Sequence, residues 1–257
     1  MNAREFAGVL LLAMAVAMAF AWGWPSPSTV LWAAILSAAV GAYLLLPRAR
    51  TRSLSTGELV MTSFSAGLSA IVGFFPPLFQ VPWMMKVDLV AVPWVVCWTW
   101  IGAFPATLSA LLSVPIVGFL EPFAAGGWVG GISKFLASVW TILVPAAVVR
   151  LGVDKEKLMN DNRKAALVSL AIALCRSVFM TAFNYYVAIP WYYGIDIENF
   201  IALLDKGLGL LKLVAPISGM SLFVLEMSFW NSIQAVIEFW ASVLLYRALK
   251  GRLGKVG

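Results

Sequence analysis

Long apolar segments dominate this chain of 257 residues and decide which solvent it can fold in. Hydrophobic residues make up 62% of the sequence and charged residues only 12%, too few to cover a water-soluble globule. Runs of roughly 17 to 25 apolar residues are long enough to cross a bilayer as helices. We therefore expect an all-α integral membrane protein with about eight spans. The runs lie at 6–24, 29–46, 58–75, 88–102, 105–120, 128–149, 165–190 and 222–249, the fourth and fifth being short.

A polar, basic linker at 48–57 divides these spans into two groups. We expect an N-terminal transmembrane hairpin at 1–47, a six-helix core at 58–250 and a tail at 251–257. Ser55 and Glu58 form the Ser-x-x-Glu pattern of a capping box, which predicts that the core begins with a helix there. Residues 191–221, which we call the lid, are too interrupted by charges to span and are expected to form an interfacial or re-entrant segment.

The distribution of cations predicts the orientation in the membrane. If the N-terminus is cytoplasmic, 13 of the 18 Lys and Arg residues fall on the inside, as the positive-inside rule requires. We therefore expect a cell-membrane protein with both termini in the cytoplasm. The net charge of +6 follows from this topology and from anionic lipid headgroups, so it is no argument for nucleic-acid binding. The 13 cations are Arg4, Arg48, Arg50, Arg52, Arg150, Lys155, Lys157, Arg163, Lys164, Arg247, Lys250, Arg252 and Lys255.

Several chemistries are excluded by residue type. The chain has no histidine, and Cys97 and Cys175 lie in separate expected spans, so neither a zinc site nor a Cys/His nucleophile is expected. No Gly-rich phosphate loop follows a strand pattern, so the chain does not hydrolyse nucleotide itself. We expect no enzyme and no cofactor.

Side-chain amides within apolar segments are the strongest functional signal. Asn231, Gln234 and Glu238 fall at positions i, i+3 and i+7, which places them on one helix face. Asn184 lies near the outer end of the preceding span, at a depth comparable with Asn231. Polar residues inside membranes usually face a partner helix, a cavity or a ligand. Such amides match the donor and acceptor edge of a uracil-like ring, although bonding between helices would also explain them.

Two charges in these same spans are expected to meet. Arg176 lies eight residues from Asn184 and Glu238 seven residues from Asn231, descents of about 12 and 10.5 Å at 1.5 Å per residue. Antiparallel neighbouring helices would bring both charges to one level below the binding site. We expect a structural ion pair, because a lone charge near the bilayer centre costs at least about 2.5 kcal/mol.

The core resembles a known family in the order of its short motifs. Across 58–249 it is similar to the substrate-binding S component of energy-coupling factor vitamin transporters, most closely the riboflavin-binding type. The motifs that carry this resemblance are Phe75-Pro-Pro, Lys86-Val-Asp88, Pro93, a Gly-rich helix opening at 126–131, Asn184-Tyr-Tyr-Val-Ala-Ile-Pro190 and Trp230-Asn231-Ser-Ile-Gln234.

The resemblance implies a vitamin-binding specificity subunit of an ATP-driven importer. Such a subunit associates with a transmembrane coupling subunit and two cytoplasmic ATPases. It implies that Asn184, Asn231 and Gln234, with Lys134 nearby, contact a flavin. It also implies that Ala66 and Ala70 contact the coupling subunit, whereas packing within the chain is the alternative for so common a spacing of small residues.

Departures from the family pattern leave the choice of vitamin open. Gln234 stands where riboflavin-type members commonly have Lys, and Lys134 stands where they commonly have Asn. Another heteroaromatic vitamin therefore remains an alternative to riboflavin. Lys86 and Asp88 are expected either to close the pocket or to form only a surface ion pair or helix cap.

Two further expectations concern aromatic residues and energy coupling. Trp83, Trp191 and Tyr192 are among the aromatic residues expected where spans meet headgroups, of which most form an interfacial belt and a minority can line a pocket. The rival function is an ion-coupled secondary transporter of a small heteroaromatic solute, using Arg176, Glu226, Glu238 or Lys134. The core shows no evident inverted repeat and no chain of intramembrane carboxylates, which weighs against that rival.

Overall fold

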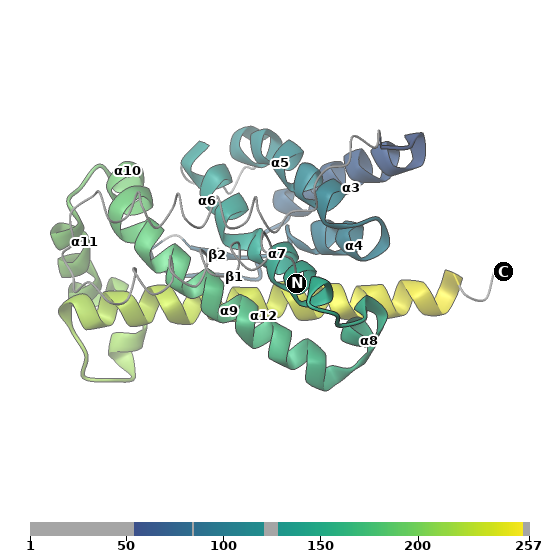
Figure 1. Cartoon of the computed structure of the whole chain (residues 1–257). Coiled ribbons are helices and arrows are strands. Elements are labelled where there is room, and N and C mark those ends of the chain that lie inside the picture. The colour runs from purple at the N-terminus through teal and green to yellow at the C-terminus, as the bar shows by residue number, and fades with distance from the viewer. Residues whose placement is uncertain (1–53, 84, 121–127, 254–257) are drawn as a thin grey trace, which may run out of the picture.

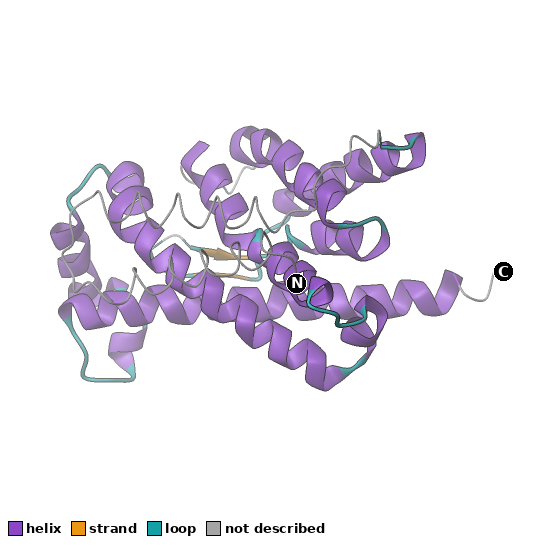
Figure 2. Ribbon diagram, in the orientation of Figure 1, coloured by secondary structure: helices purple, strands orange, loops and turns teal. Residues whose placement is uncertain are grey.

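The computed structural model describes residues 54–83, 85–120 and 128–253, so the expected hairpin at 1–47 lies outside the described residues. The described chain is built largely of helices, with one small pair of strands (Figures 1 and 2). Four of its helices are long and apolar enough to cross a membrane: Thr56–Phe74, Gly130–Arg150, Asn162–Tyr193 and Gly219–Lys250. These lengths and compositions favour an integral membrane protein.

Helix α3 (Thr56–Phe74) begins where the sequence predicts. Ser55 Oγ accepts a hydrogen bond from the Glu58 backbone N–H at 3.3 Å, and the Glu58 carboxylate accepts one from the Ser55 backbone N–H at 2.8 Å. The predicted capping box is therefore confirmed.

The small residues of α3 point into the chain. Ala66 and Ala70 are buried, and the adjacent Ser65 donates a hydrogen bond to the Pro93 carbonyl at 2.7 Å. The exposed side of α3 carries large side chains instead, including Val60 and Phe64. The expected contact of Ala66 and Ala70 with a partner stays a prediction, and their burial favours the alternative of packing within the chain.

A β-hairpin and a short helix follow α3. Strands β1 (Phe79–Gln80) and β2 (Lys86–Val87) pair antiparallel, a feature that the all-α expectation did not include. Helix α4 (Val92–Trp100) has only nine residues, about 14 Å, so the span expected at 88–102 does not cross a core of about 30 Å as one helix. Gly102, with a φ of +139° that only glycine adopts readily, turns the chain into α5 (Ala103–Leu120).

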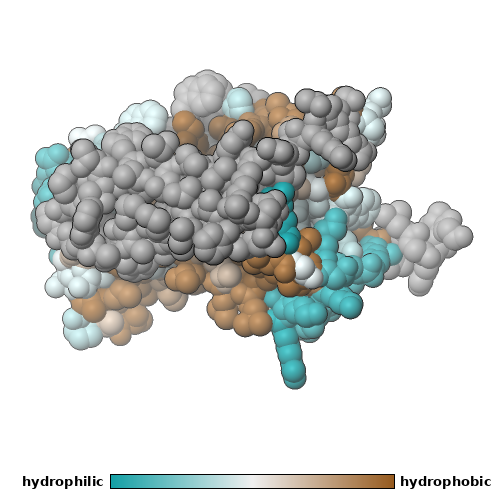
Figure 3. All heavy atoms as spheres, viewed as in Figure 1, coloured by the Kyte–Doolittle hydropathy of each residue, from teal (hydrophilic) through white to brown (hydrophobic). Residues whose placement is uncertain are grey.

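The next helices lead to a polar end of the molecule. They are α6 (Trp128–Ser138), α7 (Trp140–Arg150), α8 (Lys155–Asn160) and α9 (Asn162–Phe183). Arg247 donates hydrogen bonds to the Met159 carbonyl and to Asn162 Oδ1, both at 2.8 Å, so the end of the chain meets α8. Hydrophilic residues gather in this region (Figure 3), which we call the basic end and define by Lys155, Lys157, Arg163 and Arg247.

Helices α9 and α12 (Gly219–Leu253) lie side by side along the length of the molecule (Figure 1). Ser177 Oγ donates to the Ser228 carbonyl at 2.9 Å and lies 2.8 Å from Ser232 Oγ, and small hydroxyl residues of this kind let membrane helices approach closely. On the outer side of α9, Leu167, Leu170 and Leu174 are each at least 60% exposed. This apolar stripe suits contact with lipid.

The lid lies at the end of the molecule opposite α8 (Figure 1). It contains α11 (Ile197–Leu203), a π-helical turn (Leu204–Leu208) and a 3₁₀ turn (Leu211–Leu213). None of these is long enough to span a bilayer. The lid and the basic end therefore occupy opposite ends of the helix bundle.

Candidate functional site

Asn184 lies at the start of a π-helical turn. The chain from Asn184 to Ala188 is π-helical, between α9 and α10 (Ile189–Tyr193). Pro190 has no backbone N–H to donate to the carbonyl four residues before it, and its ring crowds that carbonyl, which gives a physical reason for the altered turn. Single π-helical turns inside α-helices are frequent at functional sites.

Helix α12 supplies the opposite face. Asn231, Gln234 and Glu238 are all buried, at 1%, 1% and 0% exposure. Their spacing puts them on the side that faces α9. Among the described residues, the partner of the Asn184 amide on the other wall is the Met227 sulfur, to which it donates at 3.4 Å, and a thioether is a weak acceptor.

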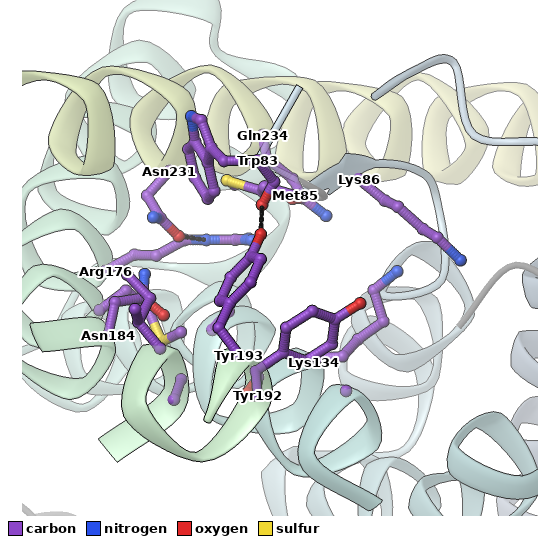
Figure 4. A pocket seen from close by; sticks show the side chains of 16 residues that line it. Trp83, Met85, Lys86, Lys134, Arg176, Asn184, Tyr192, Tyr193, Asn231 and Gln234 are labelled. Carbon is purple, nitrogen blue, oxygen red and sulfur yellow. Dashed lines mark hydrogen bonds between the residues drawn. The ribbon is translucent and has the colours of Figure 1, made fainter. Parts of the chain in front are cut away.

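Between these walls lies a cavity of about 160 Å³ (Figure 4). Its walls come from the β-hairpin, α6, α9, the π-helical turn with α10, and α12. A cavity of about this size holds a single benzene-sized ring, whereas sites for drug-sized ligands measure about 300–1,000 Å³.

Five of the residues expected to bind ligand line this one cavity. They are Lys86, Lys134, Asn184, Asn231 and Gln234. The sixth, Asp88, lies behind the wall, where its carboxylate forms an ion pair with Lys134 and accepts a hydrogen bond from the Val90 backbone N–H at 3.1 Å. Asp88 is not the cap of α4, whose N-cap residue is Ala91.

Arg176 lies in the cavity wall, not below the site as expected. Its Nη1 is 2.7 Å from Glu238 Oε2, so the two charges expected to pair do meet, with exposures of 2% and 0%. Its Nε donates to Asn231 Oδ1 at 3.2 Å (Figure 4). The helical rise along α9 correctly predicted the level of Arg176 relative to Glu238. It took no account of the long Arg176 side chain, which reaches back toward Asn231.

Aromatic residues expected where spans meet headgroups also line the cavity. Trp83 is 6% exposed and borders the cavity with Tyr192 and Tyr193, so Trp83 and Tyr192 belong to the minority expected to line a pocket. Tyr193 OH donates to the Trp83 carbonyl at 2.7 Å, which joins α10 to the β-hairpin (Figure 4). Trp191 is 57% exposed, and its place in an interfacial belt stays a prediction.

Glu226 connects the cavity wall to the lid. Its carboxylate is fully buried and accepts hydrogen bonds from Trp230 Nε1 at 2.7 Å, from Trp83 Nε1 at 3.4 Å and from the Leu211 backbone N–H at 2.5 Å. From the sequence, Glu226 was expected to act only in ion coupling, under the rival function. Its position four residues before Trp230, one helical turn away, was the available signal.

The chemistry of the cavity is that of polar recognition. Within the described ranges, no group of three His, Cys, Asp or Glu side chains could hold a metal ion. Three amides, two ion-paired cations and three aromatic residues instead surround a space that suits a planar heterocycle. Comparisons with protein-family models, with curated proteins and with solved structures found no match to this chain.

Proposed function

We propose that this protein is the vitamin-binding specificity subunit of an energy-coupling factor importer and that its ligand is riboflavin or a related flavin. The observation that carries the proposal is the convergence of Lys86, Lys134, Asn184, Asn231 and Gln234 on one cavity. These residues come from four separate parts of the chain and were expected to bind ligand on other grounds. Helix packing alone would not require them to meet.

The groups in the cavity match a flavin ring edge in kind. Amide side chains supply both donors and acceptors for the carbonyl and N–H groups of the ring. Tyr192, Tyr193 and Trp83 offer aromatic surface beside them. Lys134 and Arg176 bring positive charge close to where ring carbonyl oxygens would lie.

The size of the cavity sets a condition on this proposal. At about 160 Å³ it accommodates one ring, so a tricyclic flavin requires the surrounding side chains to move apart. A smaller heteroaromatic vitamin would need less movement and is the second candidate ligand.

The proposed setting is the cell membrane, with about eight spans and both termini in the cytoplasm. The basic end then faces the cytoplasm and the lid faces outward, so that the cavity receives ligand from outside. A transmembrane coupling subunit and two ATPases would supply the energy, since the sequence carries no phosphate loop of its own.

The direct test is to purify the protein from cells and identify what it retains. A visible flavin absorbance spectrum and the corresponding mass in the released ligand are the expected results, and titration of riboflavin into emptied protein should saturate at one equivalent. Uptake in cells should stop when the partner ATPases are deleted. Uptake that continues without them but collapses with the proton gradient would favour the ion-coupled transporter instead.

A further inference from the structure

One buried carboxylate organises the polar wall of the cavity. Glu238 accepts hydrogen bonds from Arg176 Nη1 at 2.7 Å, from Ser138 Oγ at 3.0 Å and from Gln234 Nε2 at 3.0 Å. Glu238 itself is not among the residues that line the cavity. Its effect on a ligand would therefore pass through Arg176 and Gln234, which do line it.

The bond to Glu238 fixes the orientation of the Gln234 amide. A carboxylate that pairs with a guanidinium can only accept, so the group of Gln234 that faces it must be the NH₂ and not the carbonyl oxygen. Gln234 is 1% exposed, and among the described residues no hydrogen bond reaches its Oε1. What Gln234 offers to a ligand in the cavity is thus an acceptor.

The same carboxylate fixes a donor beside that acceptor. Glu238 holds Nη1 of Arg176, and Asn231 Oδ1 accepts from Nε at 3.2 Å. The guanidinium has five N–H donors, and within the described part of the chain these bonds leave the two on Nη2 for a ligand. Asn231 is held in turn, since its Nδ2 donates to the Met227 carbonyl at 2.8 Å.

We propose that Gln234 is the specificity-determining residue of the cavity, that it accepts a hydrogen bond from a ring N–H of the ligand, and that Glu238 is the positioning residue that holds it in this state. The ligand class is a heteroaromatic cyclic imide or lactam, in which an N–H stands next to a carbonyl. The carbonyl oxygen faces Arg176. This inference rests on the proposed function, because it assigns the ligand chemistry of the same cavity.

The test compares ligands that differ only by a methyl group on the imide nitrogen. Riboflavin and 3-methylriboflavin form the first pair, and lumazine and its 3-methyl derivative form a second, smaller pair. With the full-length protein in detergent, each N–H compound should bind at least tenfold more tightly than its N-methyl partner, or about 1.4 kcal/mol, because methylation leaves Gln234 Oε1 without its donor. In Gln234→Met, which keeps the length of the side chain but lacks a strong acceptor, this ratio should fall below about threefold.

A matched variant identifies which amide accepts the hydrogen bond from the ring N–H. Asn184→Leu removes a cavity amide that has no bond to Glu238 or Arg176 among the described residues, so it should weaken both members of a pair and leave their ratio unchanged. Glu238→Gln should also lower the ratio, since a neutral amide can donate as well as accept and no longer forces Gln234 into one orientation. If that variant does not fold, the double variant Arg176→Gln/Glu238→Gln leaves no lone charge and gives the same measurement.

Each outcome decides between the two proposals. If the flavin pair binds with equal affinities, or if Gln234→Met keeps the tenfold ratio, this inference is overturned while the proposed function stands. If only the lumazine pair binds, and does so with the expected ratio, the inference stands and the flavin assignment fails. If neither pair binds at all, both proposals are overturned.

Discussion

Glu226 accepts a hydrogen bond from the backbone N–H of Leu211 at 2.5 Å, which fastens the lid to α12, the longest of the described helices. The same carboxylate holds the indole N–H groups of Trp83 and Trp230. Trp83 lines the cavity, so one side chain connects the cavity wall to the segment beside it.

The first prediction is that loss of this carboxylate loosens the lid. In Glu226→Leu, hydrogen exchange at the Leu211 amide and across 204–213 should be at least tenfold faster than in the unaltered protein, because a bond from a neutral donor to a charged acceptor contributes about 1.5–3 kcal/mol. Glu226→Gln keeps an acceptor and should exchange at an intermediate rate. Leu225→Gln, on the exposed neighbour, is the control and should leave exchange unchanged. Equal lid exchange in Glu226→Leu and the unaltered protein would show that this bond does not hold the lid.

The second prediction concerns the buried pair of Arg176 and Glu238. Either Arg176→Leu or Glu238→Leu alone should destabilise the protein by about 3–5 kcal/mol, because each leaves a charge buried without its partner. The double Leu variant should recover much of that loss, as measured by thermal unfolding in detergent. Additive losses would mean that the two charges do not interact. A pH-dependent transport defect in the double variant would instead support ion coupling.

The third prediction distinguishes two amides of the cavity by their hydrogen-bond partners within the protein. Within the part of the chain that the structure describes, Asn184 bonds a thioether and no stronger acceptor, so Asn184→Leu should weaken ligand binding at least tenfold with little change in melting temperature. Asn231 bonds both Arg176 and the Met227 carbonyl, so Asn231→Leu should lower affinity and stability together. Binding titration and thermal unfolding on the same samples measure both effects. Unaltered affinity in both variants would remove these amides from the binding site.

The fourth prediction follows from the burial of small residues on α3. Ala66→Trp should lower the melting temperature, because overpacking a filled interior typically costs 1–3 kcal/mol. Val60→Trp places the same side chain on the exposed side of this helix and should leave the melting temperature nearly unchanged. If Ala66→Trp unfolds like the unaltered protein but abolishes uptake, the small residues face a partner after all.

The sequence was most informative where the deciding interactions are local. The capping box at Ser55 involves residues three apart, and the buried face of Asn231, Gln234 and Glu238 follows from helical periodicity. Both could be predicted, because no distant segment had to be placed first. The start of α3 and the polar face of α12 are accordingly where the sequence indicates.

Predictions that depend on distant partners were less successful. Lys134 pairs with Asp88 and not with a neighbour along the chain, and the Trp83 carbonyl accepts a hydrogen bond from Tyr193, which is more than a hundred positions away in the sequence. Apolar and aromatic composition alone cannot tell an interfacial Trp from one that lines a cavity. The same limitation applies to Ala66 and Ala70, because a spacing of small residues cannot tell packing within the chain from contact with a partner.

Helix α12 has a mechanical consequence. It runs for 35 residues, about 52 Å, without a proline, and it carries Glu226 near the lid, Gln234 at the cavity and Arg247 at the basic end. A continuous helix of this length behaves as a stiff rod, so these three positions keep fixed spacing and a fixed rotational phase about one axis. The side chains that hold the lid, face the cavity and contact α8 therefore all belong to one rigid helix. None of the three can rotate about the helix axis without the other two.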